Sequence, residues 1–211
     1  MVTAIYGAYD TLKPVLPQDG LNVDWVLVTD DPTLRGMALG WRVICLPRSG
    51  VHPNRAAKQP KLFPWEFTQA PASVWLDASF RVTSPNFVSE ALALADPIAQ
   101  FVHPWRDCIF AEAKASRGLP KYAGEDFDAQ VRELGHPEHW GLWATGVIAR
   151  QHGDVRVRNL SDHWSELINR HTFQDQISQP VALRGSGLRP SALPRDYFSS
   201  PWLSYEGSER H

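Results

Sequence analysis

Short apolar runs, each about one strand long, alternate with helix-forming segments along most of this chain. The runs are rich in Val, Ile and Trp and are bounded by turn residues, which is the pattern of β-strands. They are nearly continuous in apolar residues, so they are typical of strands covered on both faces, as in a parallel sheet. The expected strands are Val2–Tyr6, Asp24–Thr29, Trp41–Leu46, Ser73–Leu76, Ile98–Val102 and Gly146–Arg150.

Helices are expected between these strands. Ser84 and Pro85 form a good N-cap and first helical position, and Pro60 and Pro64 should break the first helical segment into short pieces. The expected helices are Asn54–Phe67, Ser84–Ala95, Asp107–Arg117, Gly124–Leu134, Ser161–Asn169 and Phe173–Leu183. This alternation predicts one α/β domain with a mainly parallel sheet over residues 1–184. Residues 185–211, rich in Gly, Pro and Ser, should form an extended tail packed on or near it.

Charge and length exclude several classes of protein. The chain has 21 basic and 23 acidic residues, a balance that argues against a dedicated nucleic-acid binder. The longest segment free of Asp, Glu, Lys and Arg is His139–Ala149, far short of the roughly 20 apolar residues of a membrane-spanning helix. The first residues lack the cationic start of a secretory signal. A soluble, cytoplasmic protein without a membrane span is therefore expected.

The residues that end the expected strands are the first functional candidates, because ligands of open α/β sheets collect at the carboxyl ends of the strands. These are Tyr6 and Gly7, then Asp30, then Asp77. Asp30 could accept hydrogen bonds from a nucleobase or ribose, or simply end a strand in a turn. Asp77 could hold Mg²⁺ or Mn²⁺, which prefer oxygen ligands, or cap a turn. No glycine-rich dinucleotide or P-loop motif occurs.

Further polar groups follow the strands or open the helices. Arg55, Lys58 and Lys61 recur every three residues and could bracket phosphate oxygens, although this spacing more commonly belongs to a solvated cationic face. A second polar group consists of His103, Arg106 and Glu112. It is typical of a substrate-binding corner or of an ordinary helix start. Arg150 and His152 end the last strand, and Asp175 and Gln176 lie near a helix N-terminus, where negative charge is favoured.

Several motifs, taken in order, resemble a known family. They are PKLFP at 60–64, VWLDAS at 74–79, HPWRDCIFAEA at 103–113, GVIARQH at 146–152 and Trp164 followed by DQIS at 175–178. Together they are similar to the TOD/MUCI glycosyltransferase-like family over roughly residues 3–183. The resemblance implies a GT-A-like, Rossmann-like fold that binds a nucleotide-sugar donor.

The resemblance also implies roles for individual residues. Asp77 stands at the metal-binding acidic motif, while Tyr6, Gly7 and Asp30 would hold the nucleotide. The other polar positions typical of the family are Lys61, His103, Arg106, Glu112, Arg150, His152, Asp175 and Gln176.

Two positions depart from the family pattern. Trp65 stands where relatives often carry His, which changes that substrate contact into aromatic stacking. The two-acid DxD motif is reduced to Asp77-Ala78-Ser79. A second ligand for the Mn²⁺ or Mg²⁺ would then come from His152 or Asp175, or cationic side chains would replace the metal.

These features predict a glycosyltransferase that moves a sugar from a nucleoside-diphosphate sugar to an acceptor hydroxyl. Arg55, Lys58 and Lys61 would assist the departing diphosphate. The Asp175–Gln176 pair looks like that of some retaining GT-A enzymes and favours retention; an inverting enzyme would use Glu112 or Asp175 as base. The acceptor, whether polysaccharide, lipid, protein or modified nucleic-acid base, stays open. The alternatives are a non-catalytic glycan- or nucleotide-binding module and a metal-dependent hydrolase.

Overall fold

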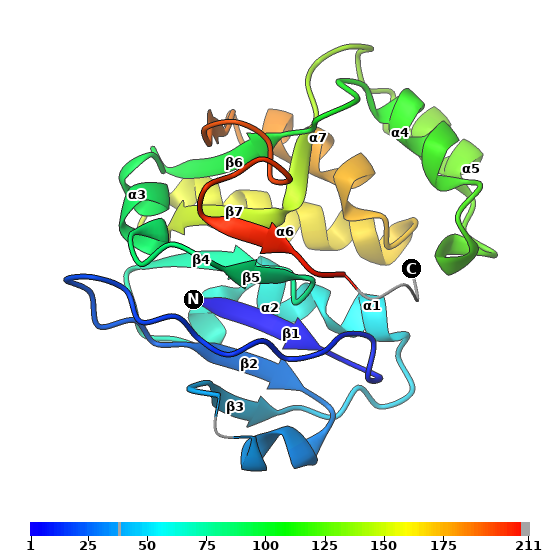
Figure 1. Ribbon diagram of the computed structural model, residues 1–211. Coiled ribbons are helices and arrows are strands. Elements are labelled where there is room, and N and C mark those ends of the chain that lie inside the picture. The colour runs from blue at the N-terminus through cyan, green and yellow to red at the C-terminus, as the bar shows by residue number, and fades with distance from the viewer. Residues whose placement is uncertain (38, 208–211) are drawn as a thin grey trace.

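A seven-stranded sheet with helices and loops on both faces organises the molecule (Figure 1). The computed structural model describes residues 1–37 and 39–207. Its strand order is β3-β2-β1-β4-β7-β6-β8, and β7 alone runs antiparallel to its neighbours in this sheet. The strands are β1 (Val2–Ile5), β2 (Val26–Thr29), β3 (Arg42–Cys45), β4 (Ala72–Leu76), β6 (Ile98–Val102), β7 (Trp143–Gln151) and β8 (Ser191–Ala192). A second, two-stranded sheet pairs β5 (Phe80–Val82) with β9 (Leu203–Tyr205).

The predicted strands are confirmed, with shifts of a few residues at their ends. The expected strand at Gly146–Arg150 lies in the second half of the longer β7. Strands β5, β8 and β9 were not expected, because runs of two or three residues carry too little pattern to identify. The fold class, a mainly parallel α/β sheet in a single domain, is as predicted.

The helices lie where the sequence places them, with local corrections. They are α1 (Pro53–Ala56), α2 (Lys58–Leu62), α3 (Phe87–Ala93), α4 (Ile109–Ser116), α5 (Phe127–Leu134), α6 (Val155–Arg170) and α7 (Asp175–Gly185), with 3₁₀ turns η1 (Pro32–Gly36), η2 (Pro64–Glu66) and η3 (Pro120–Tyr122). Helix α3 begins at Phe87, after Asn86, so Ser84 and Pro85 form the preceding turn. Helix α6 begins earlier than expected, because the Asp154 carboxylate accepts a hydrogen bond from the Arg156 amide and caps it.

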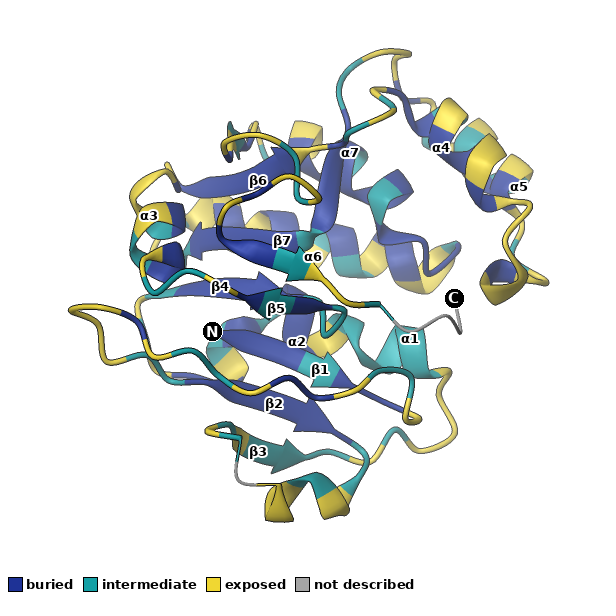
Figure 2. Ribbon diagram, in the orientation of Figure 1, coloured by how far each residue is buried: buried dark blue, intermediate teal, exposed yellow. Residues whose placement is uncertain are grey.

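Each face of the sheet is covered by its own apolar layer (Figure 2). Helix α6 has a buried stripe that includes Val157, Leu160, Trp164 and Ile168, spaced three or four residues apart, which is the spacing of one helix face. This stripe packs with α2 and α7 on one face of the sheet. Helix α3 and the C-terminal segment cover the other face. No helix in the described residues is both long enough and apolar enough to cross a membrane.

The segment after α7 returns to the domain and joins it. Strand β8 pairs with β6, and β9 pairs with β5. Between them the Trp202 ring is 5% exposed and lies 5.7 Å from the Phe87 ring and 6.4 Å from the Phe101 ring, measured between centroids. The Trp202 indole N–H also donates to Glu90 on α3. Trp202 therefore anchors the C-terminal segment to the core.

We expect Trp202→Ala to lower the free energy of unfolding by about 3–5 kcal/mol, because a large buried side chain is removed and a cavity remains. Urea denaturation at pH 7 measures the loss. The matched control is Trp105→Ala: the Trp105 side chain is 64% exposed, so the same substitution should change stability by only about 0.5 kcal/mol or less. Equal losses in the two variants would contradict the anchoring role of Trp202.

Candidate functional site

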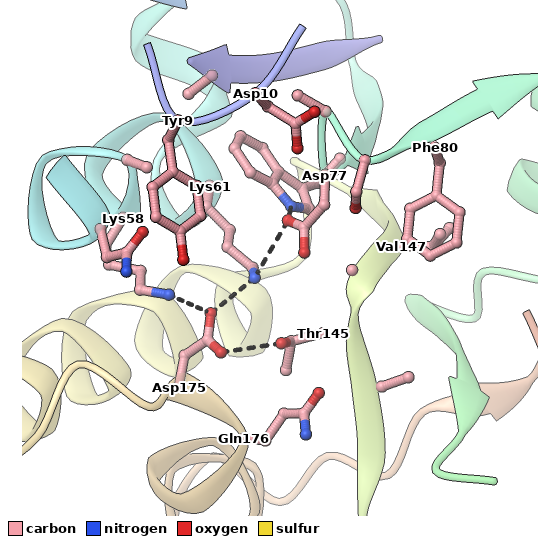
Figure 3. Close-up of a pocket in the computed structure, with 18 of the residues that line it drawn as sticks. Tyr9, Asp10, Lys58, Lys61, Asp77, Phe80, Thr145, Val147, Asp175 and Gln176 are labelled. Carbon is pink, nitrogen blue, oxygen red and sulfur yellow. Dashed lines mark hydrogen bonds and ion pairs between the residues drawn. The ribbon is translucent and has the colours of Figure 1, made fainter. Parts of the chain in front are cut away.

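An open pocket of about 300 Å³ lies where strand order reverses, between β1 and β4. From β1 the chain proceeds outward to β2 and β3, whereas β4 lies on the other side of β1, and this reversal is where open α/β sheets bind ligands. The walls of the pocket come from the loop after β1, the end of β4, helix α2, the middle of β7 and the start of α7 (Figure 3).

Two lysine side chains meet in this pocket around one carboxylate. Lys58 and Lys61, one turn apart on α2, both point at Asp175, the first residue of α7. The Asp175 carboxylate lies 2.8 Å from Lys58 Nζ and 2.6 Å from Lys61 Nζ, and it accepts a hydrogen bond of 2.9 Å from the Thr145 hydroxyl on β7. With Asp77, these residues form the lysine–aspartate cluster.

The charges of the cluster stabilise one another. Burial alone would raise the pKa of Asp175, but the two ammonium groups hold it well below its usual range. Burial would likewise lower the pKa of Lys61, yet Asp175 and Asp77 outweigh this and raise that pKa. For Lys58 burial prevails and lowers the pKa, although Asp175 opposes the shift. Asp175 is thus held as an anion and is poorly suited to accept a proton as a general base.

Asp77 directly follows β4 and is the more open acid of the cluster. Its side chain is 41% exposed and lies 3.6 Å from Lys61 Nζ. Its Oδ1 accepts a hydrogen bond of 2.6 Å from the Trp75 indole, and its amide donates to the Gly146 carbonyl on β7. A Cβ at Gly146 would lie 3.2 Å from Asp77 Oδ2 and 3.0 Å from the Phe80 ring, so glycine lets β7 approach Asp77 closely.

The predicted divalent-ion site does not fit these residues. His152, the suggested second ligand, is at the opposite end of the sheet: its ring lies beside Ala70 and Ser73, at the start of β4. Asp175, the other suggestion, is occupied by two lysines and a threonine. Within residues 1–37 and 39–207, no group of three His, Cys, Asp or Glu side chains could hold a metal ion. The pocket does contain positive charge, because Lys58, Lys61 and Lys121 line it.

The expected substrate corner forms a second, buried network beside the pocket. Glu112 on α4 is 3% exposed and accepts hydrogen bonds from Arg106, from Gln174 at 2.9 Å and from Gln176 at 3.1 Å. His103 lies 3.5 Å from the same carboxylate, and burial lowers its pKa. Of this group only Gln174 and Gln176 line the pocket. Glu112 therefore positions the Gln176 amide from outside the pocket wall and is not open to a substrate.

Of the residues expected to hold the donor nucleotide, Lys58 and Lys61 line the pocket, whereas Tyr6, Gly7, Asp30 and Arg55 do not. Gly7, in the left-handed turn after β1 (φ 61°), donates its amide to Asp30 Oδ1 at 2.9 Å, and Asp30 also pairs with Arg48 at 2.8 Å. Tyr6 and Arg55 line a separate hollow of about 270 Å³ near the end of β3. The Arg55 guanidinium donates to the carbonyls of Ile168 and His171, so Arg55 is not joined to the lysine–aspartate cluster.

Arg150 and Trp65 do not reach the pocket either. Arg150 is 1% exposed and donates to the backbone carbonyl of Lys61, and burial lowers its pKa to about 9. Trp65 packs edge-on against the His152 ring, 5.6 Å away, with the Arg158 guanidinium over its face. Arg150, His152 and Trp65 thus support the packing of the sheet against α2 and η2, away from the predicted substrate site.

Sequence reasoning missed part of the pocket wall. Tyr9 and Asp10 come from the loop after β1, Thr145 from the middle of β7, and Tyr197 and Tyr205 from the C-terminal segment. The expectation that ligands collect at the carboxyl ends of the strands, here called the strand-end rule, could have pointed to Tyr9 and Asp10, which lie only a few residues beyond β1. No local signal marks the other three.

Known structures share this fold. An apo structure of WbbM, described as a bifunctional glycosyltransferase, superimposes with a TM-score of 0.54 at 12% identity, covering 92% of this chain and 38% of that one. This chain therefore spans well under half of that WbbM chain. The likeness confirms the Rossmann-like fold and, at this identity, shows the fold alone.

Two weaker likenesses have TM-scores too low to support any conclusion. One is a CMP:2-keto-3-deoxy-manno-octonic acid synthetase complexed with CTP, with a TM-score of 0.45 at 15% identity, covering 91% of this chain and 87% of that one. The other is the apo form of mouse xyloside xylosyltransferase 1, with a TM-score of 0.40 at 13% identity, covering 75% of this chain and 66% of that one. No protein-family model matches the sequence and no curated protein is significantly similar, so the TOD/MUCI resemblance stays a prediction.

We expect Asp175→Asn to lower the free energy of unfolding by about 3–5 kcal/mol at pH 7, because it leaves two buried ammonium groups without their shared anion. A carboxyl with a depressed pKa stabilises the fold above its unfolded pKa of about 3.9, and this stabilisation is lost as pH falls through the folded value. The difference from wild type should therefore be constant from pH 5 to 8 and shrink below about pH 4. Urea denaturation across this range measures it.

The matched control is Asp77→Asn. The Asp77 side chain is 41% exposed and lies farther from Lys61 than Asp175 does. Its replacement should therefore cost about 1 kcal/mol or less. A loss for Asp175→Asn that is no larger than this, or that does not change with pH, would show that the cluster does not stabilise the fold.

Proposed function

We propose that this protein is a glycosyltransferase that uses a nucleoside-diphosphate sugar, with Lys58 and Lys61 as the groups that receive the diphosphate. The observation that carries the proposal is the pair of lysines, Lys61 buried and Lys58 largely buried, held by Asp175 in an open pocket at the switch point. The fold shared with WbbM, a glycosyltransferase by its description, supports the proposal by analogy.

The lysines meet the main electrostatic demand of the reaction. In glycosyl transfer the bond between the anomeric carbon and the diphosphate oxygen breaks, and negative charge develops on the departing diphosphate. Preorganised cations directed at that charge are usually the largest contribution to rate enhancement. Each ammonium has three N–H donors, so the contact with Asp175 leaves donors on Lys58 and Lys61 for phosphate oxygens.

The remaining polar groups of the pocket complete the step. The acceptor hydroxyl oxygen forms the new bond to the anomeric carbon, and its proton leaves either to Asp77 or to the departing diphosphate. Gln176, positioned by Glu112, would hydrogen-bond the hydroxyl groups of the donor sugar. Because Asp175 and Glu112 are occupied by hydrogen bonds and ion pairs, neither serves as base in this proposal. Proton transfer to the departing diphosphate on the same face of the sugar gives retention, which we favour.

Replacing Lys58 tests the proposal with the smallest disturbance of the fold. Its side chain is 16% exposed and has one ion pair, whereas Lys61 is 4% exposed and lies between two carboxylates. We expect one of the nucleoside diphosphates UDP, GDP or ADP to raise the melting temperature of the wild type, and CMP, which has a single phosphate, to raise it less. In Lys58→Met the affinity for that nucleoside diphosphate should fall about 10–100-fold, the value of a charge-assisted hydrogen bond.

Lys114→Met is the control, since Lys114 is an exposed cation on α4 outside the pocket; it should bind like wild type. The absence of a shift with all four nucleotides would overturn the proposed function. Incubation with the matching nucleotide sugars then separates the candidate functions. Sugar transfer or slow sugar release is expected of a transferase, while binding without either identifies a binding module. Asp77→Ala should keep nucleotide affinity within a fewfold. Loss of turnover in this variant would show that Asp77 takes the acceptor proton, and retained turnover would show that the diphosphate takes it.

A further test concerns the cation. If the lysines supply the positive charge, the stabilisation by the nucleoside diphosphate should be the same, within about twofold in affinity, with 1 mM EDTA as with Mn²⁺ or Mg²⁺ (roughly millimolar free ion, in excess of typical protein affinities). Isothermal titration in the two buffers measures this without any turnover. Binding that requires the divalent ion would instead restore the metal-assisted mechanism at Asp77.

A further inference from the structure

A strip of exposed aromatic side chains leads out of the pocket across the surface. It consists of Trp105, Phe198 and Tyr205, which are 64%, 48% and 48% exposed. Trp105 and Phe198 have ring centroids 5.3 Å apart, and Phe198 and Tyr205 are 5.5 Å apart. In the part of the chain that the structure describes, these three are the exposed large aromatic residues. We call them the aromatic strip.

The aromatic strip is continuous with the pocket. Tyr205 belongs to the pocket wall, as does Tyr197, whose ring lies 4.3 Å from that of Phe198. Phe80, also in the wall, packs edge-on against both tyrosines, at 5.5 Å from Tyr197 and 5.4 Å from Tyr205. The strip thus starts inside the pocket and ends on the surface at Trp105, in the loop between β6 and α4.

Folding alone does not explain this arrangement. The three residues come from a loop after β6, a loop before β9 and β9 itself, so distant parts of the chain bring them together at the surface. Leaving large rings in water forgoes the free energy that their burial would provide. Exposed aromatic patches beside a pocket are typical of binding surfaces.

The chemistry of the aromatic strip fits a saccharide. A sugar ring has a face of C–H groups and a rim of hydroxyls, and the C–H groups carry partial positive charge that the negative face of an aromatic ring attracts. The spacing of the strip's rings is comparable to the length of one sugar residue. Beside Trp105, the Arg106 guanidinium lies 5.8 Å from the ring centroid and is partly exposed, so it can donate to hydroxyl groups.

We propose that the aromatic strip binds the acceptor, and that the acceptor is an oligosaccharide or polysaccharide whose end enters the pocket beside Tyr205. This inference rests on the proposed function and names its acceptor class. The donor's diphosphate lies at Lys58 and Lys61, on the β1 and α2 side, while the strip lies on the side of β6 and the C-terminal segment. A chain stacked on the strip therefore enters the pocket without displacing the donor's diphosphate from the lysines.

Native gel electrophoresis in gels that contain soluble polysaccharide tests this. The probes are xylan, glucomannan, dextran and homogalacturonan, each against a gel without polysaccharide. We expect at least one to retard the wild type, and both Trp105→Ala and Phe198→Ala to weaken the retardation fivefold or more. Leu94→Ala is the matched control, because Leu94 is 40% exposed and lies outside the strip at the end of α3; it should migrate as wild type does.

Two further measurements separate the possible failures. Strip variants should bind the nucleoside diphosphate as tightly as wild type. If that binding is intact and no polysaccharide retards the protein, or if the strip variants are retarded as wild type is, the acceptor site is overturned and the proposed function stands. If no nucleotide binds, the proposed function falls, whatever the gels show. A dimer in sedimentation that Trp105→Ala abolishes would show that a second copy of the chain covers the strip, and would also overturn the proposal.

Discussion

The ion pairs of Lys58 and Lys61 with Asp175 are the interaction on which the rest of the site depends. Removing three charges from water is costly, and only close pairing with further hydrogen bonds offsets that cost. Here Thr145 on β7 supplies a hydrogen bond to the carboxylate, and the Trp164 indole holds the backbone carbonyl of Asp175 at 3.1 Å. The cluster therefore ties α2, α6, α7 and β7 together. The cations are placed when the chain folds, so a ligand need not organise them.

This arrangement also accounts for the proposed cation chemistry. A lone buried lysine tends to lose its proton, because burial disfavours the charged form. The shared carboxylate opposes that tendency at both lysines, and at Lys61 it outweighs burial together with Asp77, so the pKa of Lys61 is raised. Asp77, the exposed member, is the acid that an incoming group would meet first. Asp77 and the Lys61 ammonium beside it thus form a coherent electrostatic unit.

The fold could be predicted from the sequence because each long strand is a continuous apolar run, and the strand-end rule then found Asp77 at the pocket. The same rule misplaced Arg150 and His152, and the reason is geometric. It holds for parallel strands, whose carboxyl ends share one edge, whereas β7 is antiparallel to β4 and β6. The end of β7 therefore lies at the opposite edge, and Thr145 in its first half lies at the pocket. Apolar composition does not encode the direction of a strand.

The C-terminal segment shows a second limit of local patterns. Its Gly, Pro and Ser content indicates an extended tail, and nothing in it predicts that Tyr197 and Tyr205 complete a pocket wall. Their placement follows from β9 pairing with β5 and from Trp202 lying in the core. The pocket consequently has two unlike sides, a charged one from α2 and α7 and an aromatic one from the last strands. The proposed transferase would hold its anionic donor on the charged side and a neutral acceptor on the aromatic side, whose two tyrosines come from the C-terminal segment.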